Sequence, residues 1–161
     1  MNVDEILTLR SEGIDPLRSP VLLVALSGWF DVGTTASAAV ERFVDPATAV
    51  TVAEIDPDPF YDFTQERPYV EIHDGEVQVL RWPENAFKIC RRAGSRDLVV
   101  LLGTEPHLAW PTYAEAVVTV AERLGCEAVV TVGAAAEAVP HTRTPLVTGS
   151  TTNTDLARRL G

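Results

Sequence analysis

Short apolar runs alternate with amphipathic stretches along much of this chain. The runs have the length of strands and cover residues 20–26, 49–55, 98–102 and 128–132. Continuous apolar runs are typical of strands that are covered on both faces, as in parallel sheets. Amphipathic helices place apolar residues three or four positions apart, and stretches with this spacing follow several of the runs. The pattern predicts an α/β fold, a three-layer αβα sandwich around a mostly parallel sheet.

The first predicted helix follows the run at 20–26. It is expected to begin at Thr34 or Thr35, because threonine caps helices well, and to stop at Asp45 and Pro46. Its apolar face comprises Ala36, Ala39, Val40 and Phe43. The helix and the run at 49–55 would complete a strand, helix, strand unit with a right-handed crossover.

Two more helices are predicted in the second half of the chain. One begins at Pro111, whose missing N–H costs nothing in a first turn, and ends at Gly125. Its apolar face comprises Ala114, Val117, Val118, Ala121 and Leu124. The last helix is capped by Asn153 or Thr154 and is expected to end at Gly161.

Three segments have other patterns. Tyr69–Ile72 and Val77–Trp82 flank Asp74-Gly75, a turn pair that accepts positive φ, so an antiparallel hairpin at one edge of the sheet is predicted. Residues 85–92 alternate like a strand but have the length of a short helix, and we favour the strand. Residues 146–148 are expected to add a further short strand.

Length and charge bound the class of protein. With 161 residues, 46% of them hydrophobic, the chain is predicted to form one domain spanning 1–161. The chain stops directly after a helix, so this domain is expected to be incomplete at its C-terminus. A net charge of -10 argues against binding to nucleic acid or to an anionic membrane.

Location and redox state follow from two absences in the sequence. The N-terminus carries Asp4 and Glu5 in place of a basic segment, and no run approaches the length of about 20 apolar residues of a membrane helix. We therefore expect a cytoplasmic protein. Cys90 and Cys126 are too few and too far apart for a disulfide framework or a metal motif, so both are expected to be reduced core thiols.

The loops after the predicted parallel strands hold the candidate site residues, because α/β folds bind ligands beyond the carboxyl ends of their strands. In the first loop these are Gly28 and Asp31. Asp31 precedes a predicted helix, so its carboxylate could cap the helix or hold a ligand hydroxyl.

The second loop contains Gly103, Glu105 and His107. A carboxylate and an imidazole two residues apart could share acid and base roles if they converge on one pocket. The alternative interpretation is that Glu105 caps backbone amides and that His107 lies on the surface or at an interface.

The loop after the next strand repeats this composition, with Gly133, Glu137, His141 and Arg143. Together the two loops resemble two halves of one ligand site. The histidine spacing is too loose for a metal motif, so no metal is expected. The segment GWFDVG lacks the signatures of phosphate and dinucleotide loops, and no GxSxG nucleophile motif is present. No cofactor is therefore expected.

Several strings of the sequence match one known family in order. LSGWFDVG, IDPDPFYDF followed by RP, DLVVLLGTEPHLAW, and GAAAEAVPHTR leading to VTGS together resemble the proteasome assembly chaperone 2 family in its actinobacterial form. The resemblance runs from about Pro20 to Gly161 and is most specific between Asp97 and Trp110.

This resemblance implies a phosphorylase/hydrolase-like αβα fold and a relation to chaperones that pair to assemble proteasome α-rings. Members of the family are longer, so this chain is expected to be the N-terminal part of such a protein. The leading hypothesis is a homo-oligomeric binding or assembly module with a proteasome-related protein partner. The competing hypothesis is an enzyme or small-ligand binder of the nucleoside phosphorylase-like type that uses the strand-end loops.

Overall fold

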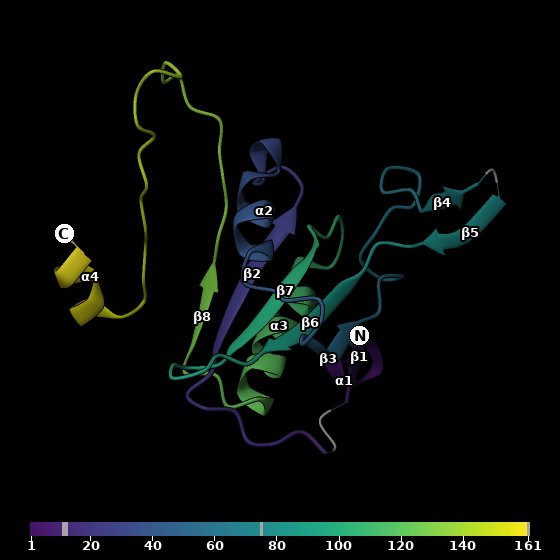
Figure 1. The fold of residues 1–161 in the computed structure, drawn as a ribbon, viewed down its shortest axis with the longest axis horizontal. Helices are drawn as coiled ribbons and strands as arrows, with labels where there is room; N and C mark the ends of the chain where they lie inside the picture. The colour runs from purple at the N-terminus through teal and green to yellow at the C-terminus, as the bar shows by residue number, and fades with distance from the viewer. Residues whose placement is uncertain (11–12, 75, 161) are drawn as a thin grey trace.

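A mixed six-stranded sheet forms the centre of the molecule. The computed structural model describes residues 1–10, 13–74 and 76–160. The sheet has the order β1-β3-β6-β7-β2-β8 (Figure 1). Its strands are β1 (Leu7–Leu9), β2 (Val21–Ser27), β3 (Val50–Ile55), β6 (Asn85–Cys90), β7 (Leu98–Thr104) and β8 (Ala128–Thr131).

The α/β class is confirmed, whereas the sheet is less parallel than predicted. The pairs β2–β7 and β2–β8 are parallel, but β1–β3, β3–β6 and β6–β7 are antiparallel. The physical reason lies in the connections, because a parallel neighbour needs a crossover, usually a helix, and the described residues between β3 and β6 form no helix. In addition, β3 does not pair with β2, the neighbour that the predicted strand, helix, strand unit would have given it, because β6 and β7 lie between them.

Most strands of the sheet have their carboxyl ends on the same side of it. The pairing directions make β2, β3, β7 and β8 point the same way, while β6 runs against them. The carboxyl ends of these four strands and Asn85, the first residue of β6, therefore lie at the same edge. We call it the carboxyl edge, and the loops that leave it are those with the predicted site residues.

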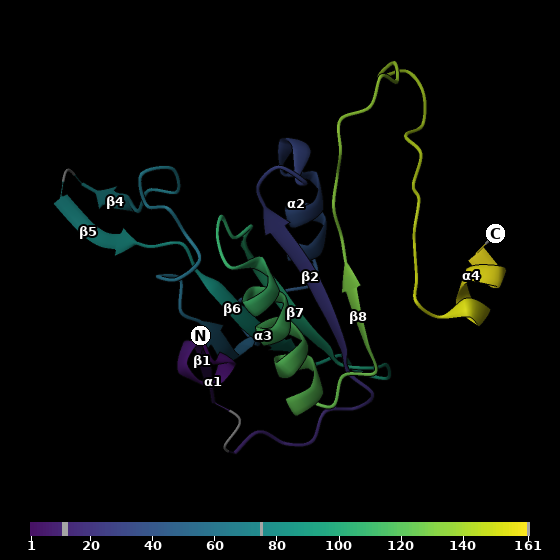
Figure 2. The ribbon, with the colours of Figure 1, turned by 180° about the vertical axis from the view of Figure 1, so that it is seen from behind.

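Two helices cover opposite faces of the sheet, as the two views show (Figures 1 and 2). Leu22 and Val24 of β2 pack in the cluster beneath α3 (Trp110–Arg123), whereas Ala25 packs with Val40 of α2 (Thr35–Glu41). Burial on both faces explains why the sequence of β2 is a continuous apolar run.

The position of α3 is as predicted, but its buried face is turned. Pro111 lies in the first turn, and Gly125, with φ +66°, follows the helix. Ala114 and Val118, predicted to face the core, are exposed. The buried residues are Tyr113, Ala116, Val117, Val120 and Ala121. With this face of α3 towards the sheet, the hydroxyl of Tyr113 reaches Asn85, a partner that an apolar pattern does not reveal.

The helix α2 is shorter than predicted. It ends at Glu41, so Phe43 lies beyond it and is exposed, with the guanidinium carbon of Arg92 5.4 Å from its ring centroid. Ala39 is exposed as well, which leaves Ala36 and Val40 as the buried residues of the helix. The helix therefore covers a small part of its side of the sheet.

The predicted hairpin is present and forms a sheet of its own. The strands β4 (Tyr69–His73) and β5 (Glu76–Arg81) pair antiparallel and stand out from the body of the molecule (Figure 1). Gly75 of the predicted turn lies outside the described residues. The segment at 85–92 is a strand, β6, as we favoured.

The N-terminal region has two elements that were not predicted, and the C-terminal region lacks one that was. At the N-terminus, α1 (Val3–Ile6) and β1 had not been predicted. Near the other end, the strand predicted at 146–148 is absent, and Leu146 and Val147 are 72% and 91% exposed. Strand propensity needs a neighbouring strand to act on, and this segment runs apart from β8 (Figure 1).

The last helix is capped as predicted. The Asn153 side chain accepts hydrogen bonds from the N–H groups of Asp155 and Leu156 at the start of α4 (Thr154–Leu160). Gly161, where the helix was expected to end, lies outside the described residues. Both cysteines are free, as expected, and burial raises the pKa of Cys90 and that of Cys126, the latter to about 11.

Candidate functional site

The loop after β2 is held in place by the carboxylate of Glu105. The N–H of Trp29 donates to Oε2 at 2.9 Å, and the N–H of Phe30 donates to Oε1 at 3.1 Å. Gly28 makes this approach possible, because a Cβ there would lie 2.6 Å from Oε2 of Glu105. Glu105 thus binds backbone amides, one of the two roles considered for it.

A second set of contacts joins the same loop to the segment after β8. The carbonyl of Phe30 accepts from the N–H of Ala134 at 2.8 Å, and the N–H of Val32 donates to the carbonyl of Ala134 at 3.1 Å. The ring of Phe30 lies against Gly133, where a Cβ would come within 2.0 Å of it. The loops after β2, β7 and β8 therefore hold one another.

This fixed backbone displays an exposed aromatic side chain. Trp29 is 84% exposed, and its ring is stacked beside that of Phe30 with 6.2 Å between the centroids. Tryptophan is seldom so exposed, because its large apolar surface is costly to hydrate. We call residues 28–33 the Trp29 loop.

Asp31 of the Trp29 loop caps α2. Its Oδ1 accepts from the N–H of Ala36 at 2.7 Å and of Ser37 at 3.2 Å. Burial would raise the pKa of Asp31, but hydrogen bonds from Ser37 and Ala36 outweigh it, so the pKa lies below its ordinary value. The charged carboxylate therefore orients the loop against the helix that follows it.

His107 belongs to a different contact. Its Nδ1 accepts from the N–H of Asp62 at 3.1 Å, and its ring meets that of Tyr61 edge to face with 5.8 Å between the centroids. Hydrogen bonds from Thr64 and Gln65, with a smaller contribution from the nearby imidazole, outweigh the opposing effect of desolvation and lower the pKa of Asp62 to about 2. Glu105 and His107 therefore make their hydrogen bonds to two different loops, and a shared acid and base role for them stays a prediction.

The remaining candidates lie on the exposed segment after β8. Glu137, His141 and Arg143 are all exposed. Among the described residues, none of their side chains shares a hydrogen bond or an ion pair with Glu105 or His107. The structure thus brings Gly28, Asp31, Glu105 and Gly133 together, while ligand binding by the wider predicted set stays a prediction.

Sequence reasoning missed a buried polar network under the carboxyl edge. Asn85 is 1% exposed, and its Nδ2 donates to the hydroxyl of Tyr61. Its Oδ1 accepts from the N–H of Thr104 at 3.2 Å and from the hydroxyl of Tyr113 at 2.9 Å. Burial raises the pKa of Tyr61 to about 12 and raises that of Tyr113 as well.

This network joins four elements at one point: the loop after β3, the first residue of β6, the end of β7, and α3. The sequence held one indirect signal of it in Gly103, where a Cβ would lie 1.9 Å from Oδ1 of Asn85. A glycine at the end of a strand has several causes, however, so the signal could not identify the partner.

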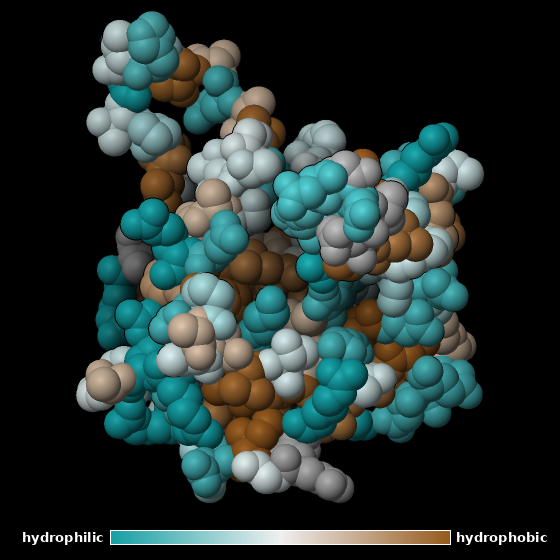
Figure 3. Space-filling model, turned by 45° about the vertical axis from the view of Figure 1, so that its right-hand side comes forward, coloured by the Kyte–Doolittle hydropathy of each residue, from teal (hydrophilic) through white to brown (hydrophobic). Residues whose placement is uncertain are grey.

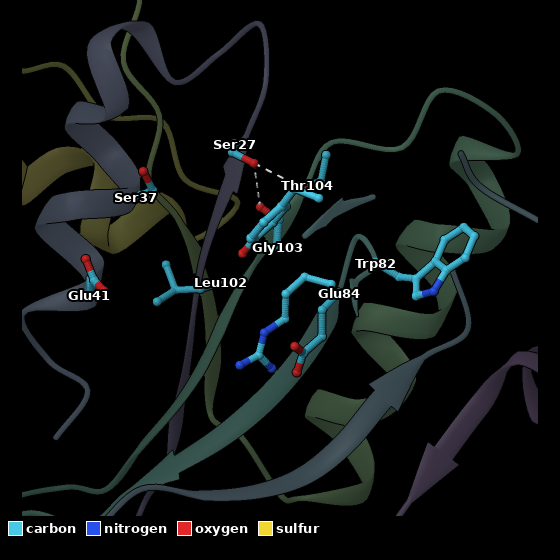
Figure 4. A pocket seen from close by; sticks show the side chains of 10 residues that line it. Ser27, Ser37, Glu41, Trp82, Glu84, Leu102, Gly103 and Thr104 are labelled. Carbon is cyan, nitrogen blue, oxygen red and sulfur yellow. Dashed lines mark hydrogen bonds between the residues drawn. The ribbon is translucent and has the colours of Figure 1, made fainter. Parts of the chain in front are cut away.

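A hollow of about 500 Å³ lies at the carboxyl edge between α2 and the hairpin. Figure 3 shows apolar surface at the bottom of a hollow on this side, with polar surface around it. In the close view, Ser37 and Glu41 come from α2, Trp82 and Glu84 lie across from them, and Gly103 is between (Figure 4). We call this hollow the edge groove; it is also lined by Ser27, Tyr69, Arg81, Leu102 and Thr104.

Among the described residues, no three histidine, cysteine, aspartate or glutamate side chains come together as a metal site would need. None of the described helices is long and apolar enough to span a membrane.

Fold and site together define an α/β protein whose strand-end loops brace one another and display an aromatic side chain. The chain belongs to the PAC2 family, whose model matches residues 25–161. This finding confirms the resemblance to proteasome assembly chaperones.

Solved structures agree with this assignment. A proteasome-assembly chaperone homologue of Mycobacterium tuberculosis is 34% identical, with a TM-score of 0.79 over 88% of this chain. A PAC2 family protein of Streptomyces avermitilis is 33% identical, with a TM-score of 0.76 over 88% of this chain. The chain spans 60% of the length of each of them.

More distant similarity extends to archaea. An archaeal proteasome activator of Pyrococcus furiosus is 18% identical, with a TM-score of 0.53 over 78% of this chain and 50% of its own, and shares the fold. A search of curated proteins finds no match.

Proposed function

We propose that this chain is a protein-binding module of the assembly-chaperone type and that the Trp29 loop is its contact with a partner. The observation that carries the proposal is an indole 84% exposed on a backbone that Glu105 and Ala134 hold in place. Exposed tryptophans dominate the energetics of many protein interfaces. A backbone ordered before binding loses little further entropy on binding, which favours affinity.

The family suggests the kind of partner. The Mycobacterium tuberculosis relative is described as a proteasome-assembly chaperone homologue, which supports a proteasome-related protein as the partner of this chain too. The net charge of -10 favours a partner surface that is neutral or basic. The proposal includes a cytoplasmic location, where such a partner would be found.

Direct binding tests the proposal. Purified actinobacterial proteasome α-subunits are passed over the immobilised chain in biolayer interferometry, with Trp29→Ala compared with wild type. Loss of an interface anchor worth about 2 kcal/mol or more should weaken binding about 30-fold. Trp110→Ala is the matched control, since Trp110 is also exposed but begins α3, and it should bind like wild type. Equal binding by the Trp29→Ala variant, or none by wild type, contradicts the proposal.

Self-association is part of the same proposal. Sedimentation velocity over a range of protein concentrations should show wild type forming a homo-oligomer. A sedimentation coefficient that stays at the monomer value at every concentration contradicts this part and leaves the binding test standing.

A further inference from the structure

The edge groove is a site separate from the predicted ligand residues. Of those residues only Gly103 lines it, through its backbone. The floor is formed by the ends of β2 and β7, where the hydroxyl of Ser27 donates to the carbonyl of Gly103 at 3.1 Å. The walls are α2 on one side and the arms of the hairpin on the other (Figure 4). Ligands of α/β proteins commonly bind at such strand ends.

The lining has an excess of negative charge. Glu41 and Glu84 are exposed, and within the described part of the chain neither side chain makes a hydrogen bond or an ion pair. Arg81 is the single cation of the lining, and Glu71 neutralises it with Nε–Oε1 at 3.1 Å and Nη2–Oε2 at 3.4 Å. Glu84 also lies close enough to Arg81 to contribute to the raised pKa of Arg81, so Glu41 is the carboxylate left without a cation, and the lining as a whole keeps a negative charge that favours a positive group from outside.

Aromatic surface accompanies these carboxylates. Tyr69 and Trp82 are 62% and 51% exposed and both line the edge groove. The ring of Trp82 also packs against that of Phe63, edge to face with 5.1 Å between the centroids. Tryptophan and tyrosine faces attract cations, and the attraction grows as water is excluded.

The negative character continues along the carboxyl edge. A neighbouring hollow of about 390 Å³ shares Glu84 with the edge groove and is also lined by Glu5 and Asp56. A segment longer than one side chain could therefore follow the edge while remaining near carboxylates.

We propose that the edge groove binds an arginine side chain, flanked by an apolar residue, from an extended segment of a partner protein. A planar guanidinium stacks on an indole while it pairs with carboxylates, which a lysine ammonium does less well. The apolar neighbour would cover the apolar floor at Leu102. This site rests on the proposed function in that the ligand comes from a protein, but it needs no contribution from Trp29.

A peptide titration tests the site directly. A five-residue peptide with a central arginine flanked by leucines is titrated into the chain and followed by tryptophan fluorescence. A second peptide carries citrulline, which keeps the shape of arginine without its charge. We expect saturable binding of the arginine peptide and at least 10-fold weaker binding of the citrulline peptide. Equal binding of the two peptides, or no saturable binding of the first, overturns the site.

Variants locate the binding. Glu41→Gln and Glu84→Gln should each weaken it about 3-fold, as loss of one partly exposed charge pair would, and the double variant about 10-fold. Glu115→Gln, at an exposed position of α3, is the matched control and should change nothing. Unchanged binding by the double variant overturns the assignment to the edge groove, and circular dichroism verifies that the variants fold.

The outcomes separate this site from the proposed function. Peptide binding without binding of proteasome α-subunits keeps the edge groove and removes the proposed partner. If α-subunits bind and the arginine peptide does not compete with them, the proposed function stands and the edge groove is not part of that interface. A self-association that the peptide abolishes identifies a second copy as the occupant and overturns the assignment to a different partner protein.

Discussion

Both oxygens of the Glu105 carboxylate accept hydrogen bonds from the backbone of the Trp29 loop. Replacing it by glutamine leaves one acceptor and turns an amide donor towards an N–H group. We expect Glu105→Gln to lower the free energy of unfolding by about 1–3 kcal/mol, because a hydrogen bond from a backbone N–H group to a charged carboxylate is lost. Urea unfolding followed by circular dichroism measures it.

Glu137→Gln is the control for this prediction. Glu137 was an equal candidate in the sequence but is exposed, so its change should stay within about 0.5 kcal/mol. Equal effects of the two variants would contradict the structural role of Glu105.

Asn85 is the second residue whose role depends on contacts. Asn85→Ala removes a partner from the hydroxyls of Tyr61 and Tyr113 and from the N–H of Thr104. Because these groups stay buried, we expect a loss of about 2–4 kcal/mol in the free energy of unfolding. A loss below 1 kcal/mol in the same urea experiment would show that water or other groups replace the asparagine.

Asp97 links stability to pH. It is 3% exposed and accepts from the N–H groups of Arg18 at 2.9 Å and Arg92 at 3.1 Å. The Arg18 hydrogen bond outweighs burial, and the Arg92 amide and the Arg91 charge add to it, so the pKa of Asp97 is lowered. A folded-state pKa below the unfolded value of about 3.9 gives stability that is complete above that value and is lost as pH falls through the folded pKa.

We therefore expect the melting temperature of wild type to decrease as the pH drops below about 4, and part of this decrease to come from the protonation of Asp97. In Asp97→Asn, the melting temperature at neutral pH should be lower than that of wild type. Between about pH 5 and pH 2, the range in which carboxylates titrate, it should also decline less than that of wild type. Thermal melts across this range measure both. Parallel curves for the two proteins would mean that Asp97 titrates alike in the folded and unfolded chain.

The sequence was enough to select Asp31 and Glu105 as candidates, but not to decide which role each of them has. Capping by Asp31 and amide binding by Glu105 were among the alternatives that the residue types allowed. Choosing between them required knowing which loops meet, and that depends on strand order. Asn85 had no signal of its own, because an asparagine at the start of a strand looks like any turn residue until the two tyrosines come into contact with it.

Among the elements, α3 offers the sharpest comparison. Val120 is buried against the sheet, whereas Val118, one of the residues predicted to face the core, is 49% exposed. Val120→Ala should cost about 2–3 kcal/mol through lost burial and the cavity it leaves, while Val118→Ala should stay within about 0.5 kcal/mol. Chemical unfolding of the two variants decides which face of α3 lies on the sheet, and the reverse order would restore the predicted face.

The elements themselves were largely predictable, because continuous apolar runs and helical spacing reflect burial directly. The hairpin and β6 followed from a turn pair and from alternation. What the pattern could not supply was direction, since a buried strand reads the same in a parallel or an antiparallel sheet. The antiparallel position of β6 decides the site, because it places Asn85 beside Thr104 at the carboxyl edge.

For the whole molecule, two features meet at the carboxyl edge: the Trp29 loop and the edge groove. The first displays the exposed ring of Trp29 on a backbone held by hydrogen bonds, and the second is acidic and lined with aromatic side chains. Relatives extend well beyond the length of this chain, which spans 60% of two of them. For the residues present, we propose above all that the Trp29 loop is ordered before a partner protein binds to it.

Hydrogen–deuterium exchange tests that claim most directly, on the chain alone and mixed with proteasome α-subunits. The account predicts that the amides of Trp29 and Phe30 exchange slowly in the free chain although the indole is exposed, because Glu105 accepts both N–H groups. It predicts slower exchange still in the mixture, and loss of protection in Glu105→Gln. Rapid exchange of these amides in the free chain, or binding that leaves their exchange unchanged, would contradict it.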